Sequence, residues 1–364
     1  MAQRIRLGLI GASVRGTWSS RSHLPAARAN VDVELTAVCT TKADSAEAAR
    51  VAYGARLAFD DWRKMVVSPE IDAVAVVVRV PSHYEPTKAA LEAGKYVYCE
   101  WPLGRTTAEA VELAALAKAQ GLVTAIGLQA RVNPAVMHLK ELVAAGYVGE
   151  VMAVHVSLMR EGVLTRRSHR TWQRDAALGA NTLIIANGHT IDAMRFVVGD
   201  FARVSAVIST QAKQWLDIDT NTWLEVTSPD NILTSGRLKN GAVASVHIAA
   251  IPYAGSGYRM EIYGRDGTLV AAGEDSPQLR EVTLHGAQKG DTLAPIAVPE
   301  RFMVAASGTP AGEALNVGQM YTLFARAVRD GKGQQPDFDT AVELHRLVDG
   351  IKAASDTGRE ADFE

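Results

Sequence analysis

Short apolar segments alternate with helical segments along the first third of the chain, and this alternation constrains the fold more than any other feature. Residues 5–10, 34–39, 71–78, 96–99 and 123–127 are apolar runs typical of buried strands. Residues 43–53, 86–93 and 107–120 have helical patterns. Strands and helices that alternate at this spacing form a doubly wound parallel sheet with right-handed crossovers. We therefore predict an α/β Rossmann domain over residues 1–128.

The pattern changes after residue 128. Helices are expected at 135–145, 182–198, 317–329 and 340–357, and strands at 151–159, 202–211, 222–228, 233–238, 242–249, 258–263 and 268–272. Strands separated by Gly, Asn and Asp turns favour antiparallel pairing. We predict an α+β substrate and oligomerisation domain over residues 129–364, built on a large, mainly antiparallel open sheet. We expect a second subunit to cover the outer face of this sheet, which gives a homodimer or homotetramer.

Composition excludes several classes of protein. The 364 residues are 48% hydrophobic and 21% charged, and the net charge of −2 does not favour nucleic acid or an anionic membrane as a partner. No apolar span reaches 18 residues, and the N-terminus runs straight into a strand without a signal peptide. Cys39 and Cys99 end apolar runs and are expected to be reduced core thiols of a cytoplasmic protein. Neither the histidines nor the cysteines have the spacing of metal ligands.

A glycine turn directly follows the first expected strand. It reads Gly11-Ala12-Ser13-Val14-Arg15-Gly16, a G-x-G-x-x-G pattern with serine at the middle glycine. The first glycine permits the tight turn, the last is expected to let helix and strand approach, and the Ser13 hydroxyl can donate to a phosphate oxygen. The pyrophosphate of a dinucleotide would lie at the helix N-terminus. The alternative is a glycine turn that binds no ligand.

The end of the second strand bears on the choice of cofactor. A dinucleotide with a free ribose 2′-hydroxyl is usually met there by a carboxylate. This chain has Thr40, Thr41 and Lys42 instead, with Arg15 expected nearby. Two hydroxyls and a cation favour a 2′-phosphate, so we predict NADP in preference to NAD. Under the alternative, Lys42 is solvated and has no role.

Five segments carry a resemblance to a known family. They are Gly11–Gly16 with Trp18 and His23-Leu24-Pro25, residues 80–85 (Val-Pro-Ser-His-Tyr-Glu), residues 100–103 (Glu-Trp-Pro-Leu), residues 127–131 and residues 188–192. Together they resemble the glucose–fructose oxidoreductase / inositol dehydrogenase (Gfo/Idh/MocA) family. Its branch that includes the galactose-regulon repressor of yeasts, a transcriptional regulator, is the most similar.

The resemblance implies a nicotinamide cofactor and a set of residues that bind it. Beyond the glycine turn and residues 40–42, the expected contacts are Val80, Pro81, His83, Glu100, Trp101, Pro102 and Gln129. For His83 a loop-packing role is the alternative.

The chain departs from the family at two catalytic positions. The family's Glu-Lys-Pro lysine is Trp101 here, and the aspartate four residues before the catalytic histidine is Ile185. Only His189 is kept. Indole has one N–H donor and no titratable proton, so Trp101 cannot replace the lysine chemically.

The remaining side chains can still support hydride transfer. His189 titrates near neutral pH and can serve as the acid/base, and Asp192 lies three residues later on the same helix face. Trp101 would form a wall beside the nicotinamide. Arg131 and Trp172 are the expected substrate contacts. The alternatives are that His189 is a structural histidine, that Trp101 is a core tryptophan and that Arg131 forms a surface ion pair.

Two functions therefore compete. The first is an NAD(P)-dependent oxidoreductase that acts on a sugar, polyol or related alcohol or carbonyl compound. The second is a non-catalytic NAD(P)-binding regulatory protein, which the two lost catalytic positions favour. Lyase, epimerase or glycosidase chemistry with a bound cofactor is a third, lesser possibility.

Overall fold

The computed structural model describes residues 4–333 and 336–363, which divide into two compact units. Unit 1 comprises Met1–Gln129 and Met303–His345, and unit 2 comprises Ala130–Phe302 and Arg346–Glu364. The sequence predicted a division between residues 128 and 129. Residues 303–333 and 336–345, which that division assigned to the second domain, group with unit 1.

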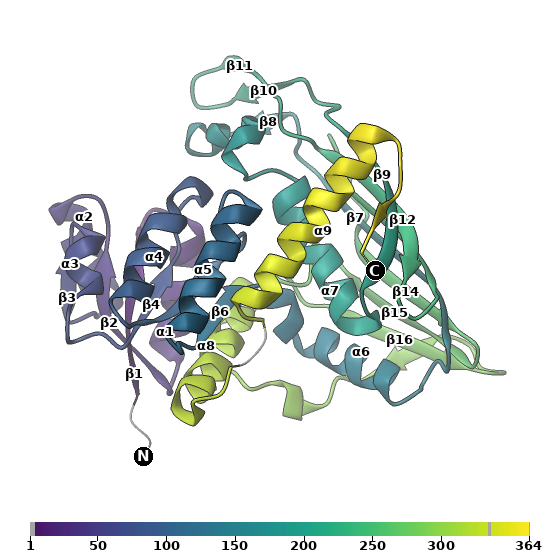
Figure 1. Cartoon of the computed structure of the whole chain (residues 1–364), viewed down its shortest axis with the longest axis horizontal. Coiled ribbons are helices and arrows are strands. Elements are labelled where there is room, and N and C mark those ends of the chain that lie inside the picture. The colour runs from purple at the N-terminus through teal and green to yellow at the C-terminus, as the bar shows by residue number, and fades with distance from the viewer. Residues whose placement is uncertain (1–3, 334–335, 364) are drawn as a thin grey trace. The chain divides into compact units, whose positions relative to one another are not determined.

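Unit 1 is built on a parallel sheet with the strand order β3-β2-β1-β4-β5-β6 (Figure 1). Its strands are β1 (Ile5–Ile10), β2 (Val33–Cys39), β3 (Leu57–Phe59), β4 (Ala73–Val76), β5 (Tyr96–Glu100) and β6 (Thr124–Gly127). All five neighbouring pairs are parallel. The Rossmann fold predicted from the sequence is therefore confirmed, and the chain reverses its order of strands between β1 and β4.

Helices cover both faces of this sheet. They are α1 (Leu24–Ala29), α2 (Ala43–Tyr53), α3 (Trp62–Val66), α4 (Tyr84–Glu92), α5 (Thr107–Ala119) and α8 (Glu313–Asp330). Helix α8 packs against α1, and α4 packs against α3 and α5. The start of α5 is set by Thr106, whose hydroxyl accepts a hydrogen bond of 3.2 Å from the backbone N–H of Glu109.

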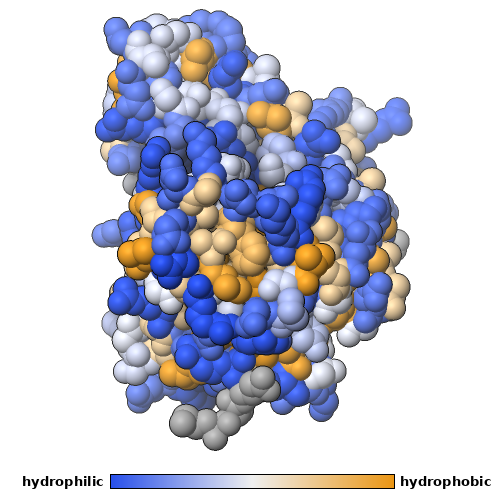
Figure 2. All heavy atoms as spheres, turned by 90° about the vertical axis from the view of Figure 1, so that its left-hand side faces the viewer, coloured by the Kyte–Doolittle hydropathy of each residue, from blue (hydrophilic) through white to orange (hydrophobic). Residues whose placement is uncertain are grey.

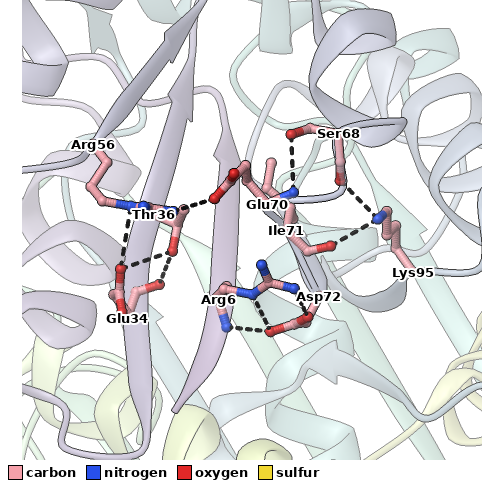
Figure 3. Close-up of polar contacts among 9 residues, drawn as sticks. All are labelled: Arg6, Glu34, Thr36, Arg56, Ser68, Glu70, Ile71, Asp72 and Lys95. Carbon is pink, nitrogen blue, oxygen red and sulfur yellow. Dashed lines mark hydrogen bonds and ion pairs between the residues drawn. The ribbon is translucent and has the colours of Figure 1, made fainter. Parts of the chain in front are cut away.

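Polar contacts join the segments at the N-terminal ends of β1, β4 and β5 (Figure 3). Arg6 on β1 donates from Nη2 and Nε to the Asp72 carboxylate at 2.6 and 3.0 Å. Lys95 donates to the carbonyl oxygens of Ser68 and Ile71 at 2.9 and 2.8 Å. These contacts connect β1 with the segments that lead into β4 and β5.

Unit 2 contains a sheet with the strand order β17-β16-β15-β14-β7-β13-β12-β9-β18. Its strands are β7 (Val151–Arg160), β9 (Phe201–Ser209), β12 (Asn231–Leu238), β13 (Val243–Ala250), β14 (Gly257–Gly264), β15 (Gly267–Gly273), β16 (Thr283–Gln288), β17 (Ala294–Ile296) and β18 (Ala361–Asp362). Only the β7–β13 pair is parallel among these strands. The predicted large, mainly antiparallel sheet is confirmed.

One face of the large sheet is buried beneath helices, and the other is exposed. The helices of unit 2 are α6 (Pro134–Ala144), α7 (Gly188–Val198) and the C-terminal part of α9 (Phe338–Thr357). Val156, Val246 and Met260 form one row of the buried face. The register puts Val207 opposite Leu233 on the exposed face.

A second, small sheet has the order β11-β10-β8. Its strands are β8 (Thr165–Arg166), β10 (Gln214–Asp217) and β11 (Thr222–Glu225). The sequence assigned residues 222–228 to the large antiparallel sheet, and this was wrong. A separate apolar cluster that includes Val163 and Trp215 supports the small sheet.

Hydrophilic side chains predominate on the face of the molecule that Figure 2 shows, and apolar side chains gather near its middle. Large apolar side chains exposed in unit 1 include Val31, Val51 and Val67. Apolar atoms make up more than half of the accessible surface of ordinary folded proteins, so single exposed valines need no partner.

Candidate functional site

The glycine turn occupies the carboxyl end of β1 and depends on Gly11. This residue has φ +93°, and a Cβ added to it would lie 2.2 Å from the carbonyl oxygen of Val77. The backbone N–H groups of Gly11 and Ala12 both donate to the carbonyl oxygen of Cys39, at 2.9 and 3.1 Å. Only glycine combines this backbone conformation with such a close approach to β4.

Of the other two key positions of the turn, Gly16 differs from the sequence expectation and Ser13 does not. A Cβ at Gly16 would meet no atom within 4 Å, so the prediction that Gly16 lets helix and strand approach is wrong. Its φ of +63° is the reason for a glycine here. The Ser13 hydroxyl accepts a hydrogen bond from the backbone N–H of Arg15 at 3.2 Å and retains its own hydrogen for a ligand. Val14, Arg15 and Gly16 are exposed.

A π-helical turn, η1 (Ser19–His23), follows the glycine turn and leads into α1. The Ser19 hydroxyl donates to the carbonyl oxygen of Gly11 at 2.7 Å. This bond attaches the start of the helix to the glycine turn. A Rossmann turn of this kind, with an open glycine and exposed backbone, fits a dinucleotide pyrophosphate.

The end of β2 has two exposed polar side chains, Thr41 and Lys42. The Thr40 hydroxyl is engaged within the protein, because it lies 2.6 Å from Ser45 Oγ and 3.1 Å from the carbonyl oxygen of Lys42. Sequence reasoning missed two carboxylates near the end of β2, those of Asp60 and Asp61 in the loop after β3. Their charges act on Cys39, the last residue of β2: burial first, and then the charges of Asp61 and Asp60, raise the pKa of Cys39 to about 12.

His83 links the ends of β4 and β5. It follows η2 (Val80–Ser82), which contains Pro81, and its ring nitrogens lie 2.6 Å from the carbonyl oxygen of Pro102 and 3.1 Å from that of Val78. Burial lowers the pKa of His83, although both backbone contacts raise it. The buried His83 therefore holds the two loops in place, because both of its ring nitrogens face backbone carbonyl oxygens.

Glu100 ends β5 and accepts two hydrogen bonds at one carboxylate oxygen. His23 Nε2 lies 2.8 Å and Gln129 Nε2 lies 2.7 Å from Glu100 Oε1. Gln129 also donates to the Tyr98 hydroxyl at 3.2 Å. All four side chains are buried. His23 was noticed in the sequence only as part of a motif, since nothing local in the chain indicates a partner 77 residues away.

Trp101 is buried at the end of β5, with 3% of its surface exposed. Its ring centroid lies 4.8 Å from that of His345, which belongs to the first part of α9. Burial lowers the pKa of His345 to about 4, so this imidazole is neutral at neutral pH. The surroundings of Trp101 thus include an uncharged ring that the sequence did not point to.

In unit 2, His189 lies in the first turn of α7, after a π-helical turn, η6 (Leu183–Asn187). π-Helical turns are rare and frequent at functional sites. His189 is buried, with 6% of its surface exposed. Ile185, which the sequence resemblance aligns with the family's aspartate, is half-buried.

Asp192 is bound by Arg131. The guanidinium donates from Nε and Nη2 to the two carboxylate oxygens at 2.8 and 2.7 Å, and the Asp192 side chain is fully buried. Arg195, one turn along α7, lies 3.8 Å from the same carboxylate. A two-point contact of this kind fixes α7 relative to the segment before α6.

Trp172 lies half-buried in η4 (Ser168–Arg174), a segment rich in cations. Two arginines directly before η4 contact the protein itself. Arg167 pairs with Asp219 at 2.6 Å, and Arg166 stacks on the Trp215 ring at 4.3 Å. Burial lowers the pKa of Arg166 to about 10.

Two further searches cover residues 4–333 and 336–363. Within these ranges no three His, Cys, Asp or Glu side chains are grouped so that they could hold a metal ion. Across the same residues, no helix has the length and apolar character needed to cross a membrane.

Comparisons with known proteins identify the family. Residues 5–128 match the profile described as oxidoreductase family, NAD-binding Rossmann fold, and residues 136–270 match the GFO/IDH/MocA C-terminal domain. Dehydrogenase aclE of Aspergillus oryzae is 27% identical over 374 residues, which cover 99% of this chain and 98% of that protein. The galactose/lactose metabolism regulatory protein GAL80 of Kluyveromyces lactis is 28% identical over 257 residues, which cover 66% of this chain and 56% of that protein.

A solved structure has the same fold along the whole chain. Levoglucosan dehydrogenase in complex with NADH and L-sorbose superimposes with a TM-score of 0.87 at 23% identity, covering 99% of both chains. With both domain profiles matched over more than half of its length, the chain belongs to the Gfo/Idh/MocA family of oxidoreductases with an NAD-binding Rossmann fold.

Proposed function

We propose that this protein is an NAD(P)-dependent oxidoreductase that acts on a sugar, polyol or related alcohol or carbonyl compound. The observation that carries the proposal is the buried His189 in the first turn of α7, in a chain that matches both domains of the family. The similarity to dehydrogenase aclE along nearly the whole chain supports an enzyme. The levoglucosan dehydrogenase fold supports a sugar-like substrate by analogy only.

The dinucleotide is held by the carboxyl ends of the strands of unit 1. Its pyrophosphate binds at the glycine turn, through the hydroxyl of Ser13 and the backbone of Val14 and Arg15. Residues Val80, Pro81 and Pro102 contact its nicotinamide half. When bound, the nicotinamide supplies or takes up the hydride.

We assign the preference for NADP to Thr41 and Lys42, the exposed polar side chains after β2. The negative charges of Asp60 and Asp61 repel a 2′-phosphate, so the preference for NADP over NAD depends on the positive charge of Lys42. Lys42→Ala should weaken NADPH binding roughly tenfold and leave NADH binding unchanged, which is the effect of losing one charge-assisted contact. Lys64→Ala, which removes an exposed lysine on α3, is the matched control. Equal losses for both dinucleotides would contradict this assignment.

His189 holds and releases the proton of the reacting hydroxyl or carbonyl oxygen, since a free imidazole titrates near neutral pH. Trp101 contributes an uncharged wall in place of the family's lysine, and Trp172 contacts the substrate. Arg131 and Asp192 act on each other, so we assign them to positioning α7.

His189→Ala tests the assignment of the acid/base. Turnover should be lost, while the affinity for the dinucleotide should stay within about twofold, because the residue acts in proton transfer only. The matched control is His138→Ala, which removes another buried histidine of unit 2. Full activity of the His189 variant would exclude this mechanism.

The second candidate is a non-catalytic, NAD(P)-binding regulatory protein. Two points favour it: the resemblance places Trp101 and Ile185 at the family's catalytic lysine and aspartate positions, and the chain is similar to the GAL80 regulator. It predicts dinucleotide binding without any redox change and recovery of a protein partner from native extract.

We propose a homodimer or homotetramer formed through the outer face of the nine-stranded sheet. Val207, Leu233, Val243 and Tyr263 are all at least 41% exposed, and the strand register puts them on this one face. Leu233→Asp should convert the oligomer to a smaller species in light scattering. Val67→Asp, which alters an exposed valine of unit 1, should not. A monomeric unmodified protein would contradict the proposal.

A further inference from the structure

A buried polar network in unit 1 joins four segments that are distant in sequence. At its centre is Glu100, the last residue of β5, whose Oε1 accepts hydrogen bonds from His23 Nε2 at 2.8 Å and Gln129 Nε2 at 2.7 Å. His23 comes from η1, Gln129 follows β6, and a third element, α8, provides Tyr321. The carboxylate is therefore fixed from two directions.

The two donors are themselves fixed. The second ring nitrogen of His23 lies 2.7 Å from the Tyr321 hydroxyl, and Gln129 Nε2 also donates to the Tyr98 hydroxyl at 3.2 Å. The His23 ring packs edge-on against Tyr98 and Tyr321, with centroids 5.3 and 5.6 Å apart. Each donor thus has one orientation, and Glu100 receives both bonds at the same oxygen.

The backbone leaves space for this carboxylate. Gly127 of β6 pairs with Glu100 across the sheet, and a Cβ on Gly127 would lie 2.5 Å from Glu100 Oε1. Any other residue at 127 would displace the carboxylate or its partner. The Glu100 carboxylate therefore occupies space that is available only because residue 127 is glycine.

The same network reaches the glycine turn through η1. Ser19, the first residue of η1, donates to the carbonyl oxygen of Gly11 at 2.7 Å, and His23, its last residue, contacts Glu100. One short turn thus connects the two ends of the expected dinucleotide site. The pyrophosphate binds at the Gly11 end, and Trp101, directly after Glu100, stands at the other.

Stability alone does not explain a buried carboxylate at this place. Removing an ionised carboxylate from water is costly, and apolar side chains of similar volume are often as stabilising as a buried polar group. Buried hydrogen bonds between fixed partners instead specify one geometry. The geometry that this network specifies is that of the β5 and β6 ends relative to the glycine turn.

We propose that His23, Glu100 and Gln129 are positioning residues that couple the glycine turn to the nicotinamide end of the dinucleotide site. The proposal rests on the function proposed above, because it requires a nicotinamide dinucleotide as the ligand. Glu100 and Gln129, expected from the sequence to contact the cofactor, act on it through the backbone and Trp101 instead. Binding of the nicotinamide half depends on the network, and binding of the adenosine and pyrophosphate half does not.

The test compares ligands with and without the nicotinamide. Dissociation constants are measured by calorimetry for NADPH and 2′-phospho-ADP-ribose, and for NADH and ADP-ribose, with the full-length protein. Glu100→Gln removes the charge at constant size, and Tyr321→Phe removes only the hydroxyl that faces His23. Tyr258→Phe, which removes a fully buried hydroxyl in unit 2, is the matched control.

We expect Glu100→Gln to reduce the preference for the complete dinucleotide over its nicotinamide-free fragment about tenfold, the effect of losing one fixed charge-assisted contact. Tyr321→Phe should reduce the preference by about threefold, because one neutral hydrogen bond is lost. Both variants should bind the fragment like the unmodified protein. Thermal unfolding establishes that each variant is folded, and if Glu100→Gln does not fold, Tyr321→Phe alone decides the question.

Two results would overturn the proposal, and they differ in what else they affect. If the unmodified protein binds the dinucleotide and the variants lose fragment and dinucleotide affinity equally, or lose neither, the network is only structural and the proposed function stands. If the unmodified protein binds neither dinucleotide, the proposed function fails together with this inference.

Discussion

Gly11→Ala is expected to disrupt the glycine turn by two separate effects. The residue has φ +93°, where an L-residue costs about 1–2 kcal/mol. Its Cβ would lie 2.2 Å from the oxygen and 2.8 Å from the carbon of the Val77 carbonyl, far inside contact distance. Overpacking of this kind costs about 1–3 kcal/mol when the neighbour can shift. The variant should therefore lose about 2–5 kcal/mol of unfolding free energy.

Gly16→Ala separates the two effects. Gly16 has φ +63°, but a Cβ there meets no atom within 4 Å, so only the backbone penalty of about 1–2 kcal/mol applies. Guanidinium unfolding of both variants at pH 7 measures the difference, and titration with NADPH measures whether the turn still binds. The close approach of Gly11 to Val77 predicts that Gly11→Ala is the less stable by about 1–3 kcal/mol and loses NADPH binding. Equal destabilisation of the two variants would refute the steric argument.

Three further predictions concern charged and titrating groups. Asp192→Asn breaks a buried ion pair and should lower the free energy of chemical unfolding by about 3–5 kcal/mol. In an Arg131→Met background the same substitution should cost much less. A single variant as stable as the unmodified protein would contradict the pairing. Burial lowers the pKa of His345 to about 4, so the folded state loses stability as the pH falls from 6.5. The unfolding free energies of the unmodified protein and of His345→Gln should therefore diverge by about 2 kcal/mol between pH 7 and 4.5. Parallel curves would count against a buried imidazole. Burial raises the pKa of Asp72, but the contacts with Arg6 outweigh this effect and keep the pKa below 3.8. Asp72→Asn should therefore lower the unfolding free energy by about 1 kcal/mol at pH 7 and leave it unchanged at a pH below the folded pKa. A pH-independent loss in urea unfolding would argue against the ion pair.

In unit 1 the strands that the sequence predicted are those with apolar runs. β4 and β5 are buried on both faces, so their composition alone identifies them. The strand β3 was missed because its three residues are only half-buried at the edge of the sheet. Helix α8 was predicted as a helix and assigned to the second domain, whereas its contacts group it with unit 1, since periodicity indicates an apolar face and not the unit that covers it.

The glycine turn was predictable because its signal is local. Gly11 follows a strand directly, and the tight backbone is a property of a few consecutive residues. The partners of the buried polar groups were not predictable in the same way. His23 and Glu100 are 77 residues apart, and Arg131 and Asp192 are 61 apart. Sequence reasoning paired Asp192 with His189 from their spacing on α7, where the structure gives its carboxylate to Arg131.

We propose that the chain transfers a hydride with Trp101 at the position where the sequence resemblance places the family's lysine. A single-turnover experiment tests it most directly. Protein at near-stoichiometric concentration is mixed with NADPH or NADH and a panel of sugars, polyols, aldehydes and ketones, or with the oxidised cofactors, and the absorbance at 340 nm is followed. Even one slow turnover per protein molecule is visible under these conditions.

We expect a change at 340 nm with at least one member of the panel, absent in His189→Ala, which would establish a dehydrogenase whose site works without the lysine. No change with any member, in samples where binding of the dinucleotide is demonstrated, would contradict the proposed hydride transfer and favour the regulatory protein.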